Sequence, residues 1–175
     1  MRLEHLRYCD TPFPPYRYVP GINPHPTAHP QGHSYEPPGS PRRHAPYVPP
    51  ERWRKSDAYL YGCDLYNHGY WWEAHEAWEG LWQVTDKRGV QGRFLQALIQ
   101  VAACHLKLYQ GKAEGVRSLL ASSSGHIGFV LHAIGRSPFM GLAFAEWSER
   151  VAEYYRSRSA HDAASYPYVG LALSR

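Results

Sequence analysis

The sequence predicts an all-α protein, a compact bundle of about five helices with an extended proline-rich N-terminal arm. Thirteen of the 15 prolines lie in residues 1–50, where each removes a backbone N–H and disfavours helix at the residue before it. Beyond residue 50, apolar side chains recur at helical spacing, and no segment alternates with the period of two typical of a strand. We therefore divide the chain into a non-helical arm, residues 1–50, and a helical domain, residues 51–175.

The arm contains aromatic residues as well as prolines and histidines. Tyr16, Tyr18 and Tyr35 are examples, whereas disordered segments are usually poor in aromatic residues. We therefore expect residues 16–35 to lie ordered against the helical domain, in extended, polyproline-like backbone with turns.

The first half of the helical domain has clear start and stop signals. Pro49 and Pro50 followed by Glu51 suit the start of a helix over residues 52–68, and Gly69 suits its end. The next helices are expected over residues 70–84 and 91–110, joined by a turn at residues 85–89 and followed by Gly111.

The second half is expected to be more broken. A helix over residues 113–123 is followed by a glycine-rich break and a short helix over residues 126–134. Pro138 then separates a last long helix, residues 139–158, in which aromatic and apolar residues repeat at helical spacing. The apolar tail, residues 166–173, is expected to dock in extended form.

Composition excludes several classes of protein. No apolar run approaches the roughly 18 residues that a transmembrane helix needs, and residues 1–10 lack the apolar core of a signal peptide. Three scattered cysteines do not form a disulfide framework. A net charge of +4 without a block of Lys or Arg gives no reason to expect nucleic-acid binding. We expect a soluble cytoplasmic protein with no membrane partner. The sequence leaves open whether the protein forms a homo-oligomer.

Tryptophan, histidine and glutamate are concentrated in residues 70–82. At about 100° per residue, Trp71, Trp78 and Trp82 share one face of a helix, which we expect to be buried. His75 and Glu79 lie at the edge of that face, about 40° and 80° from Trp71. The same geometry places Glu73 and Glu76 towards the polar side.

A buried His75 and Glu79 would need partners, because an unsatisfied buried polar group costs roughly 1–3 kcal/mol. One interpretation is a structural pair between the two side chains. The other is a metal site, since His-Glu-x-x-Glu is similar to the zinc motif His-Glu-x-x-His, in which the first and last residues are ligands. In that interpretation His75 and Glu79 hold the ion and Glu76 is the general base.

His105 lies in the centre of the apolar face predicted for residues 91–110. Because a short turn joins this helix to the preceding one, the two are expected to pack antiparallel and to bring His105 to a depth similar to that of His75. His75, Glu79 and His105 are therefore predicted to form a buried cluster. The alternative is a core histidine bonded to a carbonyl or carboxylate oxygen.

Other residue patterns are less informative. His25, His29 and His33 recur at every fourth position of the arm, and they are either surface residues or additional metal ligands. The sequence contains no nucleophile elbow, phosphate loop or dinucleotide fingerprint. Cys63 and Cys104 fall in predicted helices, and no activating motif surrounds Cys63, while Cys104 is interpreted as a packing residue.

The stretch of residues 65–82, LYNHGYWWEAHEAWEGLW, resembles the signature of an uncharacterised helical family, domain of unknown function 309. Residues 93–100, RFLQALIQ, and Gly111 also resemble that family, and the resemblance covers about residues 59–123. It implies a small all-α fold but no activity. The positions that fall on the family signature are Asn67, Glu73, His75, Glu76, Glu79 and Trp82.

Two functions are consistent with these patterns. The first is a metal-dependent hydrolase in which His75, Glu79 and His105 hold a divalent ion such as zinc, Glu76 accepts a proton from the bound water, and Asn67, Glu73 and Trp82 are binding residues. The second is a non-catalytic helical binding or scaffold protein. In this alternative, His75 and Glu79 are a buried structural pair.

Overall fold

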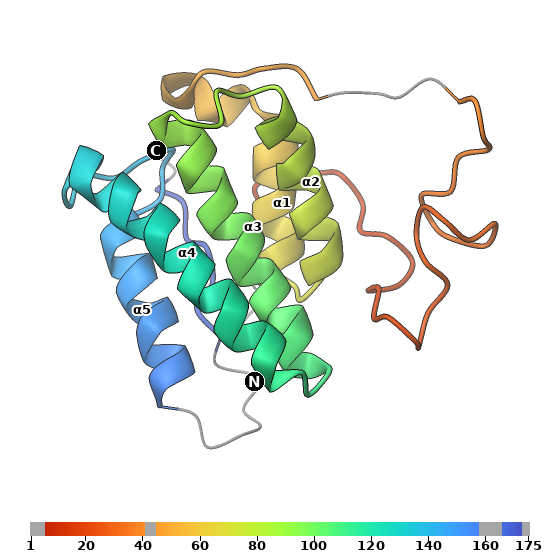
Figure 1. The fold of residues 1–175 in the computed structure, drawn as a ribbon. Helices are drawn as coiled ribbons and strands as arrows, with labels where there is room; N and C mark the ends of the chain where they lie inside the picture. Colours follow the sequence, from red (N-terminus) through yellow and green to blue (C-terminus); the bar gives the residue numbers. More distant parts are fainter. Residues whose placement is uncertain (1–5, 41–44, 158–165, 173–175) are drawn as a thin grey trace.

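The computed structural model describes residues 6–40, 45–157 and 166–172 of the 175-residue chain. The described part contains helices and isolated bridges but no named strand, which confirms the all-α prediction. Figure 1 shows the helices packed as a bundle, with the arm running out to one side of α2. The elements are the 3-10 helix η1, Pro50–Lys55, and the α-helices α1, Asp57–Asn67, α2, Trp71–Gln83, α3, Val90–Tyr109, α4, Ala113–Ile134, and α5, Phe144–Arg156.

The first predicted helix is two elements rather than one. Ser56 leaves the helical conformation between η1 and α1 and caps α1 by accepting a hydrogen bond from the backbone N–H of Tyr59. The end of α1 follows the prediction, because Gly69 adopts φ +80°, where a side chain would be strained. The bounds of α2 and α3 agree with the prediction to within one residue.

The predicted break after residue 123 is wrong. Helix α4 continues through Gly125 and Gly128 to Ile134, because glycine lowers helix stability by about 1 kcal/mol without forbidding a helix. Val116 and Val130 are buried and anchor the helix near its two ends. Helix α4 packs mainly against α3, so tertiary packing outweighs the weak local preference.

The last helix starts later than predicted. Phe139 and Leu142 exchange backbone hydrogen bonds in a tight turn that includes Met140 and Gly141, both with positive φ. Helix α5 therefore begins at Phe144, and the final residue of the predicted span, 158, lies outside the described residues.

The core is aromatic and is shared by all five α-helices and the tail. Its largest fully buried side chains come from α1, α2, α3 and α5, namely Tyr59, Tyr66, Trp78, Phe94, Phe144 and Trp147. The tail, residues 166–172, contains no helix and docks on α1, as predicted for that part of residues 166–173. Asn67 holds it, since its side chain accepts from the N–H of Val169 at 2.7 Å and donates to the Val169 carbonyl at 2.8 Å.

The arm is ordered against the bundle at residues 16–35, as predicted. Tyr18 is only 9% exposed, and its backbone N–H donates to Glu73 at the start of α2. The ring of Trp72 contacts the rings of Tyr18 and His25. Nearer the N-terminus, Arg7 pairs with the fully buried carboxylate of Asp64 at 2.9 Å.

Candidate functional site

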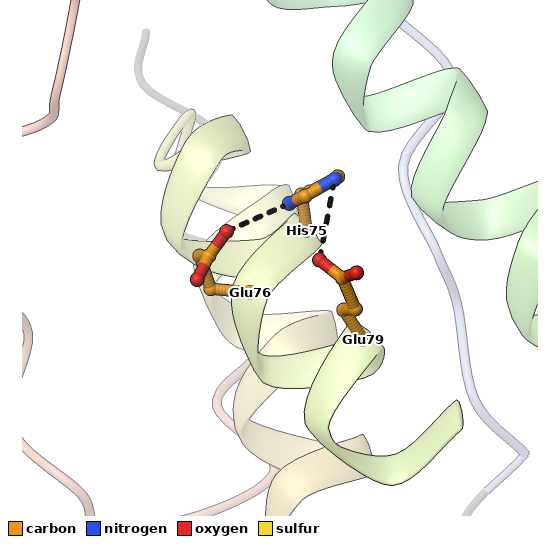
Figure 2. Close-up of side chains that lie close together, drawn as sticks. All are labelled: His75, Glu76 and Glu79. Atoms are coloured by element: carbon orange, nitrogen blue, oxygen red, sulfur yellow. Dashed lines mark hydrogen bonds and ion pairs between the residues drawn. The ribbon is translucent and has the colours of Figure 1, made fainter. Parts of the chain in front are cut away.

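Helix α2 places three metal-ligating side chains side by side near its middle. His75, Glu76 and Glu79 each offer one ligand atom, and these atoms lie within 4.8 Å of one another. The spacing explains the proximity, because residues four apart on a helix are neighbours on its surface. His75 Nδ1 lies 3.2 Å from Glu76 Oε1, and His75 Nε2 lies 3.7 Å from Glu79 Oε2. Figure 2 shows the two carboxylates at opposite sides of the imidazole.

The burial expected for His75 and Glu79 is wrong. Their side chains are 30% and 36% exposed, whereas Trp78 at the centre of the buried face is fully covered. Their positions at the edge of that face explain the difference, since the neighbouring helices cover its centre but not its edge. The pair of His75 and Glu79 is therefore not shielded from water. Solvent or an ion can reach the cluster.

His105 does not join this cluster. It is buried, and both ring nitrogens have tyrosine partners, with Tyr66 Oη 2.8 Å from Nε2 and Tyr155 Oη 2.9 Å from Nδ1. Tyr66 also donates its hydroxyl proton to the carbonyl of Pro167, so it accepts from a protonated Nε2. His105 is thus a core histidine, bonded to hydroxyls rather than to the carbonyl or carboxylate considered from the sequence.

The register of α2 against α3 explains why the two histidines do not meet. On α2, the ring of Trp71 contacts His105, with centroids 5.4 Å apart. His75 lies one helical turn further along α2 and at the edge of the buried face. The expected similarity in depth was therefore wrong by about one turn, roughly 5 Å along the helix axis.

The arm histidines are held by local hydrogen bonds. His25 Nδ1 accepts from the backbone N–H groups of Thr27 and Ala28, and His29 Nδ1 accepts from that of Gln31. These bonds engage Nδ1 of both rings, so metal ligation through Nδ1 would break them. His33 instead directs Nε2 at Glu73, 3.1 Å away.

The three predicted binding residues have different surroundings. Asn67 is buried and uses both amide atoms to hold the tail. Glu73 was expected on the polar side of α2 but is only 5% exposed, because the arm covers it. Trp82 is partly buried, with the ammonium group of Lys87 4.3 Å from its ring centroid.

Sequence reasoning missed Asp64, which is fully buried on α1. Its carboxylate accepts from the backbone N–H groups of Tyr8 and Cys9 as well as from Arg7. The sequence signal that could have identified Asp64 is its position as an acidic residue within an otherwise apolar stretch of α1. These bonds join the arm to α1, so we interpret Asp64 as a structural anchor.

The buried cysteines lack the features of nucleophiles. Burial raises the pKa of the Cys104 thiol to about 12 and raises that of Cys63 well above its ordinary value. Both side chains therefore stay protonated and inert at neutral pH, in agreement with packing roles.

No helix among the described residues combines the length and the apolar character needed to cross a lipid bilayer. Comparison with protein families matches residues 59–119 to the model described as Domain of unknown function (DUF309), the family that the sequence motif resembles. The matched segment contains most of α1, all of α2 and α3 and the start of α4, and so includes the His75, Glu76 and Glu79 cluster. No curated protein and no solved structure matches the chain.

Proposed function

We propose that this protein binds a divalent metal ion at the cluster of His75, Glu76 and Glu79, with His75 and Glu79 as its ligands, and acts as a metal-dependent hydrolase. The observation that carries the proposal is the convergence of one ligand atom from each residue within 4.8 Å. Imidazole nitrogen and carboxylate oxygen together suit zinc and other divalent ions of the first transition row. The partial exposure of all three side chains leaves a path for an ion to enter.

The proposal differs from the sequence hypothesis in its ligands. His105 is not part of it, because tyrosine hydroxyls occupy both ring nitrogens. Glu76 lies within hydrogen-bond distance of His75. Glu76 could therefore act as a general base only if its hydrogen bond to His75 were broken. Asn67 and Glu73 have structural partners, which leaves Trp82 as the predicted binding residue without a side-chain hydrogen bond among the described residues.

A bound divalent ion would supply a water whose pKa is low enough to give hydroxide near neutral pH. The contribution of the chain is to fix the ion on a rigid helix and to leave part of its coordination sphere facing solvent. Substrates could therefore approach without any opening of the bundle. This favours hydrolysis at an exposed bond, such as an ester or a phosphoester.

Metal binding is tested first, with full-length untagged protein. Isothermal titration with Zn²⁺, Mn²⁺ and Co²⁺, together with elemental analysis, should show about one ion per chain. His75→Ala should abolish binding, while His132→Ala, an exposed histidine on α4, serves as the matched control. Equal binding by wild type and His75→Ala would remove the proposal.

Turnover is tested second, on chromogenic carboxylate esters, phosphate monoesters and phosphodiesters. We expect hydrolysis that requires both the ion and His75 and that a chelator stops. Bound metal without turnover would refute the hydrolase activity while keeping the metal site. A protein that binds no ion would instead favour the helical scaffold protein that the sequence also allows.

A further inference from the structure

We infer that the metal ion lies on the Nε2 side of His75, between that nitrogen and the Glu79 carboxylate, and that Glu76 is a positioning residue that holds the ring from the Nδ1 side. This inference rests on the proposed function, and it assigns different roles to the two glutamates of one cluster. The sequence interpretation also made Glu79 a ligand but made Glu76 the general base, whereas the contact of Glu76 with His75 gives it a different role.

The shape of the ring makes the two roles exclusive. The lone pairs of Nδ1 and Nε2 point in diverging directions, and each nitrogen faces a different carboxylate (Figure 2). One ion can therefore bind only one of the two nitrogens. The other nitrogen carries a proton in the neutral ring and donates it to whichever carboxylate lies beside it.

The two distances indicate which nitrogen takes which role. Nδ1 lies 3.2 Å from Glu76 Oε1, within the range of an N–H···O hydrogen bond. Nε2 lies 3.7 Å from Glu79 Oε2, which is too long for such a bond. Two donors bound about 2.1 Å from one tetrahedral ion are about 3.4 Å apart, so this second pair needs to move by only a few tenths of an ångström to share an ion.

The exposure of the side chains agrees with this assignment. Glu76 is the most exposed of the three, at 43%, and Glu79 and His75 are covered by about two thirds. A hydrogen bond from a metal-bound histidine to a second carboxylate fixes the tautomer and orientation of the ring and strengthens it as a ligand. Glu76 would thus act on the ion through His75 rather than by touching it.

The experiment compares Glu76→Ala, Glu79→Ala and the control Glu114→Ala, an exposed glutamate on α4, in full-length protein. Zinc affinity is measured by titration calorimetry at about pH 8, where protons compete less for the ligands. We expect Glu76→Ala to weaken zinc binding by about 10–100-fold, as loss of an outer hydrogen bond does elsewhere. Glu79→Ala should weaken it further, and Glu114→Ala should leave it unchanged.

A second measurement determines which ring nitrogen of His75 carries the proton. Long-range ¹H–¹⁵N correlation spectra of metal-free protein should show His75 with its proton on Nδ1, and Glu76→Ala should shift the proton towards Nε2. In zinc-loaded protein, Nε2 should be the ligating nitrogen. Ligation through Nδ1, or a proton on Nε2 of the metal-free wild type, would overturn the assignment. Absence of zinc binding by the wild type would refute the proposed function instead, and the metal-free spectra would still decide the role of Glu76.

Discussion

His33 of the arm and Glu73 of α2 form a hydrogen-bonded pair that is almost entirely shielded from water. Nε2 of His33 lies 3.1 Å from Oε1 of Glu73, and each side chain is 4% exposed. The same carboxylate oxygen accepts the backbone N–H of Tyr18 at 2.8 Å. One acidic side chain at the start of α2 therefore holds two points of the arm that are 15 residues apart in sequence.

Glu73→Ala should release residues 16–35 from the bundle. The change leaves the Tyr18 N–H and the His33 ring without their acceptor, and each loss of a buried partner costs about 1–3 kcal/mol. Limited proteolysis with chymotrypsin should then cut at Tyr16, Tyr18 or Tyr35 much faster than in the wild type. Glu114→Ala is the matched control, and an arm that stays protected in Glu73→Ala would contradict the role of Glu73.

The same contact shows what a helical wheel cannot predict. Within α2, Glu73 lies towards the polar side, and only a segment 40 or more residues earlier turns that side into an interface. The ends of α2 and α3 were predictable because glycines and turn residues mark them locally. The continuity of α4 was not, since it depends on packing against α3 that outweighs the preferences of Gly125 and Gly128.

The candidate site was predictable in its residues but not in its surroundings. The i, i+4 relation of His75 and Glu79 follows from helix geometry alone. Whether His105 reaches them depends on the exact register of two helices, and here Trp71 takes the place beside His105 that His75 was expected to take. Burial at the edge of a helix face likewise depends on neighbours that the local sequence does not specify.

Asn67→Ala should loosen the tail. Asn67 accepts from the N–H of Val169 and donates to its carbonyl, which also accepts from the hydroxyl of Tyr8, so removal of Asn67 leaves the buried Val169 N–H without its acceptor. We expect a loss of about 1–3 kcal/mol in the free energy of unfolding, together with faster amide exchange in residues 166–172. Denaturant titration and hydrogen exchange by mass spectrometry measure the two effects.

Asn23→Ala is a suitable comparison, because that side chain accepts only from Val19 within the arm among the described residues. It should change exchange in the arm and leave the tail protected. Unchanged protection of residues 166–172 in Asn67→Ala would show that the apolar contacts of the tail are sufficient to hold it.

His126 should make the protein less stable in acid. Desolvation by burial, followed by the charge of Arg93, lowers the pKa of His126 below its ordinary value of 6.5. The unfolded chain then binds a proton more readily than the folded chain, so stability falls as the pH falls through that ordinary value and levels off below the folded pKa. His126→Gln should remove this part of the pH dependence.

Thermal unfolding followed between about pH 8 and pH 5 measures the effect, with His132→Gln as the same chemical change at an exposed position of α4. The difference in melting temperature between wild type and His126→Gln should shift in favour of the variant as the pH falls. A difference that does not vary with pH would contradict the coupling of His126 to Arg93 and to burial.

Gly62 and Gly80 should respond in opposite directions to the same substitution by alanine. A Cβ atom on Gly62 would approach Nε1 of Trp78 to 2.3 Å, and Trp78 is fully buried with its indole bonded to the carbonyl of Tyr59. We therefore expect Gly62→Ala to lower the free energy of unfolding by about 1–3 kcal/mol or more, as overpacking of a core does.

A Cβ atom on Gly80 meets no atom within 4 Å, and Gly80 lies inside α2. Gly80→Ala should raise the free energy of unfolding by up to about 1 kcal/mol, because alanine favours the helix over the unfolded chain. Denaturant titration of both variants measures the contrast. If Gly62→Ala were as stable as Gly80→Ala, α1 and α2 could not pack as closely as the contact between Gly62 and Trp78 requires, and the position of the metal cluster on α2 relative to the core would have to be revised.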